Sequence, residues 1–131
     1  MNLNNLFNFK NKIVLITGCN GQVGLSLCNL FKDLNANVYG LDVHKKSSLS
    51  TKGVNYIQCD LNFEKSIKKK LELIFRKEKK IDIIINNAAE QIFSNYKKRT
   101  EKEIARIFNI NCSSVIKIIK IYSILFEKFN M

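Results

Sequence analysis

The stretch Ile13-Val14-Leu15-Ile16-Thr17-Gly18-Cys19-Asn20-Gly21-Gln22-Val23-Gly24 joins a short apolar run to a turn with three glycines. The run is rich in β-branched residues, which is typical of a strand buried on both faces of a parallel sheet. From Val23 to Leu34 apolar residues recur at helical spacing, so a helix follows the turn.

A strand, a glycine turn and a helix in this order favour binding of a dinucleotide. A pyrophosphate needs a tight turn, a bare backbone that it can approach, and the free amides of a helix N-terminus. An ordinary glycine-rich connection is the alternative. The turn residues expected to contact the cofactor are Thr17, Gly18, Asn20, Gly21, Gln22, Val23 and Gly24.

A second strand at 37–41 ends at Asp42, 18 residues after Gly24. That offset is close to the ~20 residues at which an acid meets the adenosine ribose. A carboxylate there accepts from the ribose hydroxyls and repels a 2′-phosphate, which predicts NAD rather than NADP. Lys45 and Lys46 follow closely and could reduce the repulsion of the 2′-phosphate. The alternative to a ribose-binding role is that Asp42 only caps a loop at the end of the strand. His44 is expected to be a loop residue, with a contact near the adenosine as the alternative.

The remaining patterns continue an alternation of strands and helices. Short strands are predicted at 54–57 and 81–85, and helices at 63–76 and from 104 to about 126. Thr100-Glu101-Lys102-Glu103 has the form of a capping box. The order β-α-β-β-α-β-α predicts one α/β domain over 1–131. We expect a Rossmann-type doubly wound parallel sheet, truncated to about four strands in the order 3-2-1-4, with helices on both faces.

Apolar residues at helical spacing predict the inward faces of the two later helices. In the first they are Phe63, Ile67, Leu71, Ile74 and Phe75. In the second they are Ile104, Ile107, Phe108, Val115, Ile118, Ile119, Tyr122, Leu125 and Phe126. The lysines of the first helix would face solvent. The formal net charge of +11 therefore reflects a solvated helix face, and without interleaved aromatic residues it disfavours nucleic-acid binding.

Composition excludes several other classes. Apolar residues make up 46% of the chain, enough for a packed core, but no uninterrupted apolar stretch approaches the ~20 residues of a membrane span. The N-terminus lacks the basic and apolar regions of a signal peptide, so a cytoplasmic protein is expected. The four cysteines show no C-x-x-C spacing and there is one histidine, which predicts reduced thiols and no metal site.

Together these features resemble the short-chain dehydrogenase/reductase family, from about Asn8 to the last residue. Residues 9–18 resemble its opening strand and glycine turn. Asp60-Leu61 resembles the pair that contacts the adenine ring, and Asn86-Asn87-Ala88-Ala89 resembles the N-N-A-G signature that flanks the cofactor. By this resemblance Asn87, Ala88 and Ala89 bind cofactor, and Asn111 orders a proton-relay water.

The resemblance implies reversible hydride transfer between a nicotinamide and an alcohol or carbonyl carbon. Two details depart from a single branch of the family. The glycine spacing at 18, 21 and 24 is nearer to the extended branch, whereas the asparagine motif resembles the shorter branch. Ala89 also replaces the usual glycine, at little cost if its φ is negative.

The family's catalytic Ser and Y-x-x-x-K motif are expected beyond the fourth strand and its helix. Thr100 stands four positions after Tyr96, and Phe126 stands four after Tyr122, so neither tyrosine begins that motif. A general acid or base for carbonyl chemistry is therefore missing. The strand at 81–85, central in the full order, would become an apolar edge.

We therefore expect a cofactor-binding fragment of an oxidoreductase, either a truncated gene product or one half of a split enzyme. The expected protein partner is a complementary polypeptide or a second copy of the chain in a homo-oligomer. The alternatives are a non-catalytic dinucleotide-binding module or partner subunit, and a relic without function.

Overall fold

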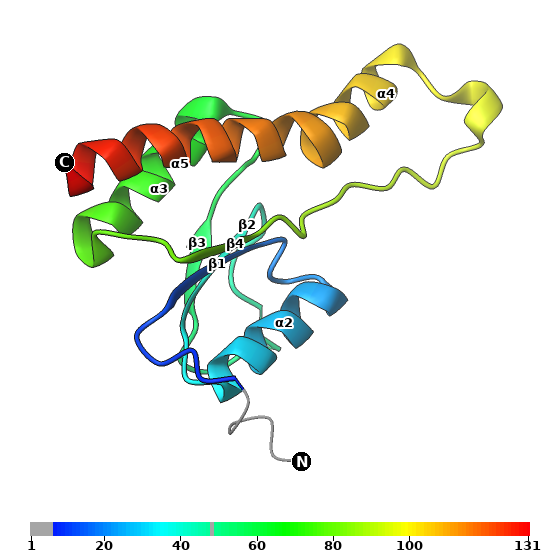
Figure 1. Cartoon of the computed structure of the whole chain (residues 1–131). Coiled ribbons are helices and arrows are strands. Elements are labelled where there is room, and N and C mark those ends of the chain that lie inside the picture. The colour runs from blue at the N-terminus through cyan, green and yellow to red at the C-terminus, as the bar shows by residue number, and fades with distance from the viewer. Residues whose placement is uncertain (1–6, 48) are drawn as a thin grey trace.

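A computed structural model describes residues 7–47 and 49–131, and it contains each predicted strand and helix (Figure 1). The elements are β1 (Ile13–Thr17), α2 (Gln22–Asp33), β2 (Asn37–Asp42), β3 (Asn55–Gln58), α3 (Glu64–Glu78), β4 (Ile83–Ile85), the 3₁₀-helix η1 (Tyr96–Lys98), α4 (Glu101–Phe108), the π-helix η2 (Asn109–Ser113) and α5 (Ser114–Asn130). The strands form one parallel sheet in the order β3-β2-β1-β4. This confirms the predicted order 3-2-1-4.

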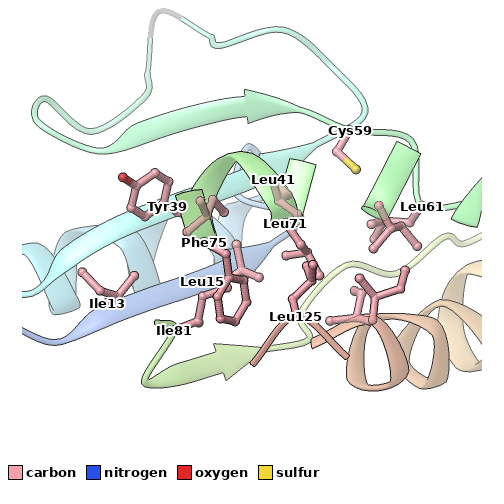
Figure 2. Packing of buried hydrophobic residues seen from close by; sticks show 14 residues of the cluster. Ile13, Leu15, Tyr39, Leu41, Cys59, Leu61, Leu71, Phe75, Ile81 and Leu125 are labelled. Carbon is pink, nitrogen blue, oxygen red and sulfur yellow. The ribbon is translucent and has the colours of Figure 1, made fainter. Parts of the chain in front are cut away.

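Strand β1 pairs with β2 on one side and β4 on the other, and all five of its residues are buried. Its side chains alternate between two cores, as the pleat of a strand requires. Val14 and Ile16 belong to the core under α2. Ile13 and Leu15 belong to the core under α3 and α5, where Phe75 and Leu125 lie beside the sheet (Figure 2). The helices thus cover both faces, as predicted.

Strand β4 is shorter than the predicted strand at 81–85, and among residues 7–47 and 49–131 its one strand partner is β1. The Asp82 carboxylate accepts a hydrogen bond from the Ile13 amide at 2.8 Å and one from the Lys80 ammonium. Partial burial works to raise the pKa of Asp82, but these hydrogen bonds and the nearby lysines outweigh it and lower that pKa. The side chain thus ties the start of this segment to β1, and Ile83–Ile85 remains an edge.

The predicted inward faces were partly wrong. Phe63 precedes α3 and is 64% exposed, whereas Ile67, Leu71, Ile74 and Phe75 are buried as expected. On the last helices Ile118 and Leu125 are buried, joined by Ile121, but four predicted inward residues are exposed: Ile104, Phe108, Ile119 and Phe126. The physical reason is that η2 interrupts the 3.6-residue period, and only one narrow face of α5 meets α3 and the sheet.

The continuous helical run from Glu101 to Asn130 is long and apolar enough to cross a membrane by composition alone. It has 30 residues, and an 18-residue window within it reaches a mean hydropathy of 1.2. That is weak evidence for a span, because a helix that covers a sheet passes the same test. Ile118, Ile121 and Leu125 are buried in the core that this helix shares with α3.

Candidate dinucleotide-binding site

A cavity of about 690 Å³ opens at the carboxyl ends of the strands, where ligands bind in open α/β sheets. The loops that follow all four strands contribute to it. Of the predicted cofactor residues, all except Thr17 line it. The lining residues are Gly18, Asn20, Gly21, Gln22, Val23, Gly24, Leu41, Asp42, Val43, His44, Cys59, Asp60, Leu61, Asn62, Asn87, Ala88, Ala89, Glu90, Gln91, Arg106 and Ile110.

Two of the three glycines in the turn are required by close backbone contacts, and the third leaves space beside the cavity. Gly18 has φ +66°, and a Cβ there would lie 2.8 Å from the Cα of Ala88. A Cβ on Gly24 would overlap the carbonyl of Gly18. A Cβ on Gly21 would meet only the Gly18 oxygen, at 3.4 Å. Gly18 and Gly24 are therefore required by packing within the protein, whereas Gly21 leaves space on the cavity side.

The first turn of α2 offers amides to the cavity. The amide of Leu25 donates to Gly21 O at 2.8 Å and is the first of the helix to find an acceptor four residues back. The amides of Gln22, Val23 and Gly24 precede it and have no such acceptor within the helix. Together with the helix dipole they favour an anion at this wall.

The Asp42 carboxylate is held at the end of β2 by two backbone amides. Its Oδ2 accepts from Asn20 at 3.0 Å, and its Oδ1 accepts from His44 at 2.9 Å. The side chain is only 10% exposed yet lines the cavity. The structure therefore brings the predicted ribose-binding acid next to the glycine turn.

Asn20 fastens the loop after β2 to the glycine turn. Its side-chain Nδ2 donates to the carbonyls of His44 and Lys45, at 3.3 and 3.0 Å. Lys46 points its ammonium over the Tyr56 ring, 5.5 Å from the centroid. Neither lysine lines the cavity. His44 lines it beside Asp42, at a position that agrees with the alternative of a contact near the adenosine.

Thr17 acts behind the cavity rather than in its wall. It is buried, and its hydroxyl oxygen accepts from the amides of Asn87 and Ala88 at 3.1 and 3.0 Å. Asn87 returns two hydrogen bonds from its side-chain amide, to the carbonyls of Thr17 and Gly18. The asparagine motif after β4 and the glycine turn after β1 are thus locked together.

Asn111 does not line the cavity, but it shapes the loop that does. Its Oδ1 accepts from the Glu90 amide at 2.8 Å, and its Nδ2 donates to the Glu90 carbonyl at 3.1 Å. The Glu90 carboxylate also pairs with Arg106 at 2.8 Å. Both polar side-chain atoms of Asn111 are therefore engaged with the backbone of one residue, Glu90.

Two buried thiols lie at this site, Cys59 in the cavity wall and Cys19 in the turn behind it, and burial raises the pKa of both. All four cysteines are free thiols, as predicted, although Cys112 is exposed rather than buried. Cys19 lies within the glycine turn. Burial, with a smaller contribution from the Asp42 charge, raises the pKa of its thiol to about 12. A thiol with that pKa stays protonated at neutral pH and is a poor nucleophile.

Sequence reasoning missed several of the lining residues. Val43, Asn62 and Glu90 each follow a motif residue closely, so proximity to the motifs was the available signal. Arg106 and Ile110 come from α4 and η2, and no pattern in the sequence indicated them. They reach the cavity because α4 and η2 lie beside the loop after β4, where Arg106 pairs with Glu90 and Asn111 bonds to the Glu90 backbone.

The fold and this cavity define an α/β protein with a parallel sheet and a cavity at the carboxyl ends of its strands, and sequence comparison identifies the family. The family model for short chain dehydrogenases matches residues 12–128. The chain therefore belongs to the short-chain dehydrogenase/reductase family of oxidoreductases.

Individual relatives agree with this assignment. An oxidoreductase of Schizosaccharomyces pombe is 32% identical over 77 residues, which cover 59% of this chain and 30% of that protein. An oxidoreductase of Saccharomyces cerevisiae is 29% identical over 120 residues, covering 87% of this chain and 38% of the relative. A short-chain dehydrogenase of Leptospira borgpetersenii, solved with bound NAD⁺, superposes with a TM-score of 0.83 at 26% identity, over 98% of this chain and 50% of that one. The chain thus spans less than half of these two curated relatives and half of that solved structure.

Proposed function

We propose that this chain binds a nicotinamide dinucleotide, with the pyrophosphate at the first turn of α2 and the adenosine between Asp42 and Asp60. The observation that carries the proposal is the common cavity wall formed by the free α2 amides and the Asp42 carboxylate. The loop from Ala88 to Glu90 would then flank the nicotinamide. This arrangement fits the cofactor of the family to which the chain belongs.

NAD is the proposed cofactor in preference to NADP. The Asp42 carboxylate can accept hydrogen bonds from ribose hydroxyls, and it would face a 2′-phosphate with like charge. The two lysines that follow in the sequence do not line the cavity, which supports the assignment of the preference to Asp42.

The proposed reaction is hydride transfer between the nicotinamide and an alcohol or carbonyl carbon. The described residues that line the cavity include no Ser, Tyr or Lys. Tyr122 donates its hydroxyl proton to the carbonyl of Ile81 and serves the core. The proposal therefore assigns cofactor binding to this chain and proton transfer to a polypeptide segment outside these 131 residues. Asn111 would hold the loop at Glu90 in place beside the cofactor. The role of Asn111 in ordering a proton-relay water is part of the same proposal.

The same observation favours a second candidate, a dinucleotide-binding module or subunit that does no chemistry by itself. The two candidates share the cofactor site, and they differ in whether a complementary polypeptide restores turnover.

Titration of the chain with NADH, followed by nicotinamide fluorescence, tests the shared site. Gly21→Val should weaken binding at least about ten-fold, because its side chain would occupy the space that the pyrophosphate backbone contact requires. Ser26→Val puts the same side chain on an exposed position of the same helix and should bind like the parent. A folded parent that does not bind NADH, or equal binding by the two variants, would remove the proposal.

A further inference from the structure

Four polar side chains form a continuous row from α5 to the cavity. The Lys117 ammonium donates to Asn109 Oδ1 at 2.8 Å. Asn109 Nδ2 donates to Asn62 Oδ1 at 2.9 Å and also approaches the Asn62 carbonyl at 3.4 Å. Asn62 Nδ2 and the Asn62 amide both donate to Asp60 Oδ1 at 2.9 Å. Asp60 and Asn62 line the cavity, whereas Asn109 and Lys117 stand behind them.

The chemistry of the two ends sets the direction of this row. An ammonium can only donate and an ionised carboxylate can only accept. Each amide between them must therefore turn its oxygen toward Lys117 and its nitrogen toward Asp60. Hydrogen bonds aligned in this way polarise one another. If the Asn62 side-chain amide were reversed, its oxygen would face the Asp60 carboxylate, and the two acceptors would repel each other. Asn109 Nδ2, by donating to Asn62 Oδ1, stabilises the opposite orientation.

The row also determines which Asp60 oxygen is available to a ligand. Both hydrogen bonds from Asn62 end on Oδ1, and Oδ2 receives none from the described residues. A ligand group that approaches Asp60 in the cavity therefore meets a carboxylate with one oxygen oriented and free to accept.

We infer that Lys117 and Asn109 are positioning residues that set the adenine selectivity of the cofactor site through Asn62 and Asp60. The inference rests on the proposed dinucleotide binding and adds a determinant from the last helices. The free oxygen of Asp60 would accept from the 6-amino group of adenine. The π-helix η2 supports this, because it presents Asn109 to Asn62 while Asn111 holds Glu90.

Calorimetric titration with NAD⁺ and with nicotinamide hypoxanthine dinucleotide tests the inference. The second ligand carries an oxygen in place of the 6-amino group. The ratio of the two dissociation constants therefore measures the hydrogen bond from that amino group to Asp60. A hydrogen bond to a charged group predicts that the parent favours NAD⁺ about ten-fold or more. Lys117→Met should reduce this ratio at least about three-fold, and Asn109→Asp, which replaces the onward donor by an acceptor, should reduce it further.

Lys120→Met is the matched control, since it removes a lysine from the same helix that pairs with Glu64 instead. It should leave the ratio at the parent value. A variant that only loosens the fold would weaken the binding of both ligands by the same factor. Circular dichroism would identify a variant that fails to fold. Lys117→Met should fold, because Lys117 is partly exposed. An unchanged ratio in a folded Lys117→Met protein, or no preference in a parent that binds NAD⁺, overturns the inference alone. A parent that binds neither ligand overturns the proposed function itself.

Discussion

Gly18 and Gly21 stand three residues apart, but only Gly18 has a backbone conformation that requires glycine. Gly18 combines a positive φ with a close approach to Ala88, whereas Gly21 has φ −71° and an open side toward the cavity. A residue other than glycine in the left-handed region costs about 1–2 kcal/mol, before any clash is counted. We expect Gly18→Ala to lower the free energy of unfolding by at least that amount.

Urea denaturation measures this difference, with Gly21→Ala as the comparison in the same turn. Gly21→Ala should lose clearly less stability, because its φ suits any residue. Equal losses at both positions would show that the approach of Gly18 to Ala88 is not tight in solution.

Asp42 is expected to decide the choice of cofactor. A hydrogen bond to a charged group contributes about 1.5–3 kcal/mol, so NADH should bind roughly 10- to 100-fold more tightly than NADPH. Asp42→Ala should narrow that gap by removing both the attraction to ribose and the repulsion of the phosphate. Parallel fluorescence titrations measure it, and Asp33→Ala removes the same charge from an exposed site on α2. A parent that binds NADPH as well as NADH would contradict the assignment of Asp42.

At the scale of single elements, the start of α4 is the clearest case of a local rule at work. The predicted capping box is confirmed: Glu103 donates its amide to the Thr100 hydroxyl at 3.2 Å, and the Thr100 amide donates to the Glu103 carboxylate at 2.7 Å. Thr100→Ala should therefore cost about 1 kcal/mol of unfolding free energy. Urea denaturation measures this loss, and Ser123→Ala, on the exposed face of α5, is the control that should leave the free energy of unfolding unchanged. If Thr100→Ala also leaves it unchanged, the start of α4 frays in solution.

The junction of α4 and α5 shows where local rules stop. Each half has a helical apolar pattern, but η2 lies between them and changes the phase at Asn109–Ser113. The face that α5 buries is therefore set by Ile118, Ile121 and Leu125 against α3, and the neighbouring apolar residues remain outside. The same junction supplies Asn109 and Asn111, which hold the loops on the two sides of the cavity.

For the whole molecule, we expect cofactor binding without turnover. The purified 131-residue chain should oxidise or reduce no alcohol or carbonyl substrate with NAD(H). The described cavity wall holds none of the Ser, Tyr and Lys side chains on which the family's chemistry depends, and loss of their general acid–base assistance should lower the rate about 10²- to 10⁴-fold. The partly exposed edge of β4 should also make the chain associate. Size-exclusion chromatography and a nicotinamide absorbance assay measure the two effects.

Addition of a polypeptide that carries the complementary strands and a Y-x-x-x-K helix should reduce association and restore turnover. A binding module without chemistry would stay inactive in the same mixture. Robust turnover by the isolated monomeric chain would instead require a proton donor within these residues, and the assignment of chemistry to another segment would be wrong.

The sequence by itself determined the strands, the helices, their order in the sheet and twelve of the cavity residues. These follow from features that act between near neighbours: a two-faced apolar strand, a turn that only glycine permits, and a motif directly after a strand. Tertiary structure alone decided that Thr17 braces the asparagine motif from behind, that Arg106 and Ile110 reach the cavity, and that Lys117 is connected to Asp60. The physical reason is that such contacts join residues far apart in the chain, and they depend on the phase of η2 and on how α5 packs against α3, which no local pattern encodes.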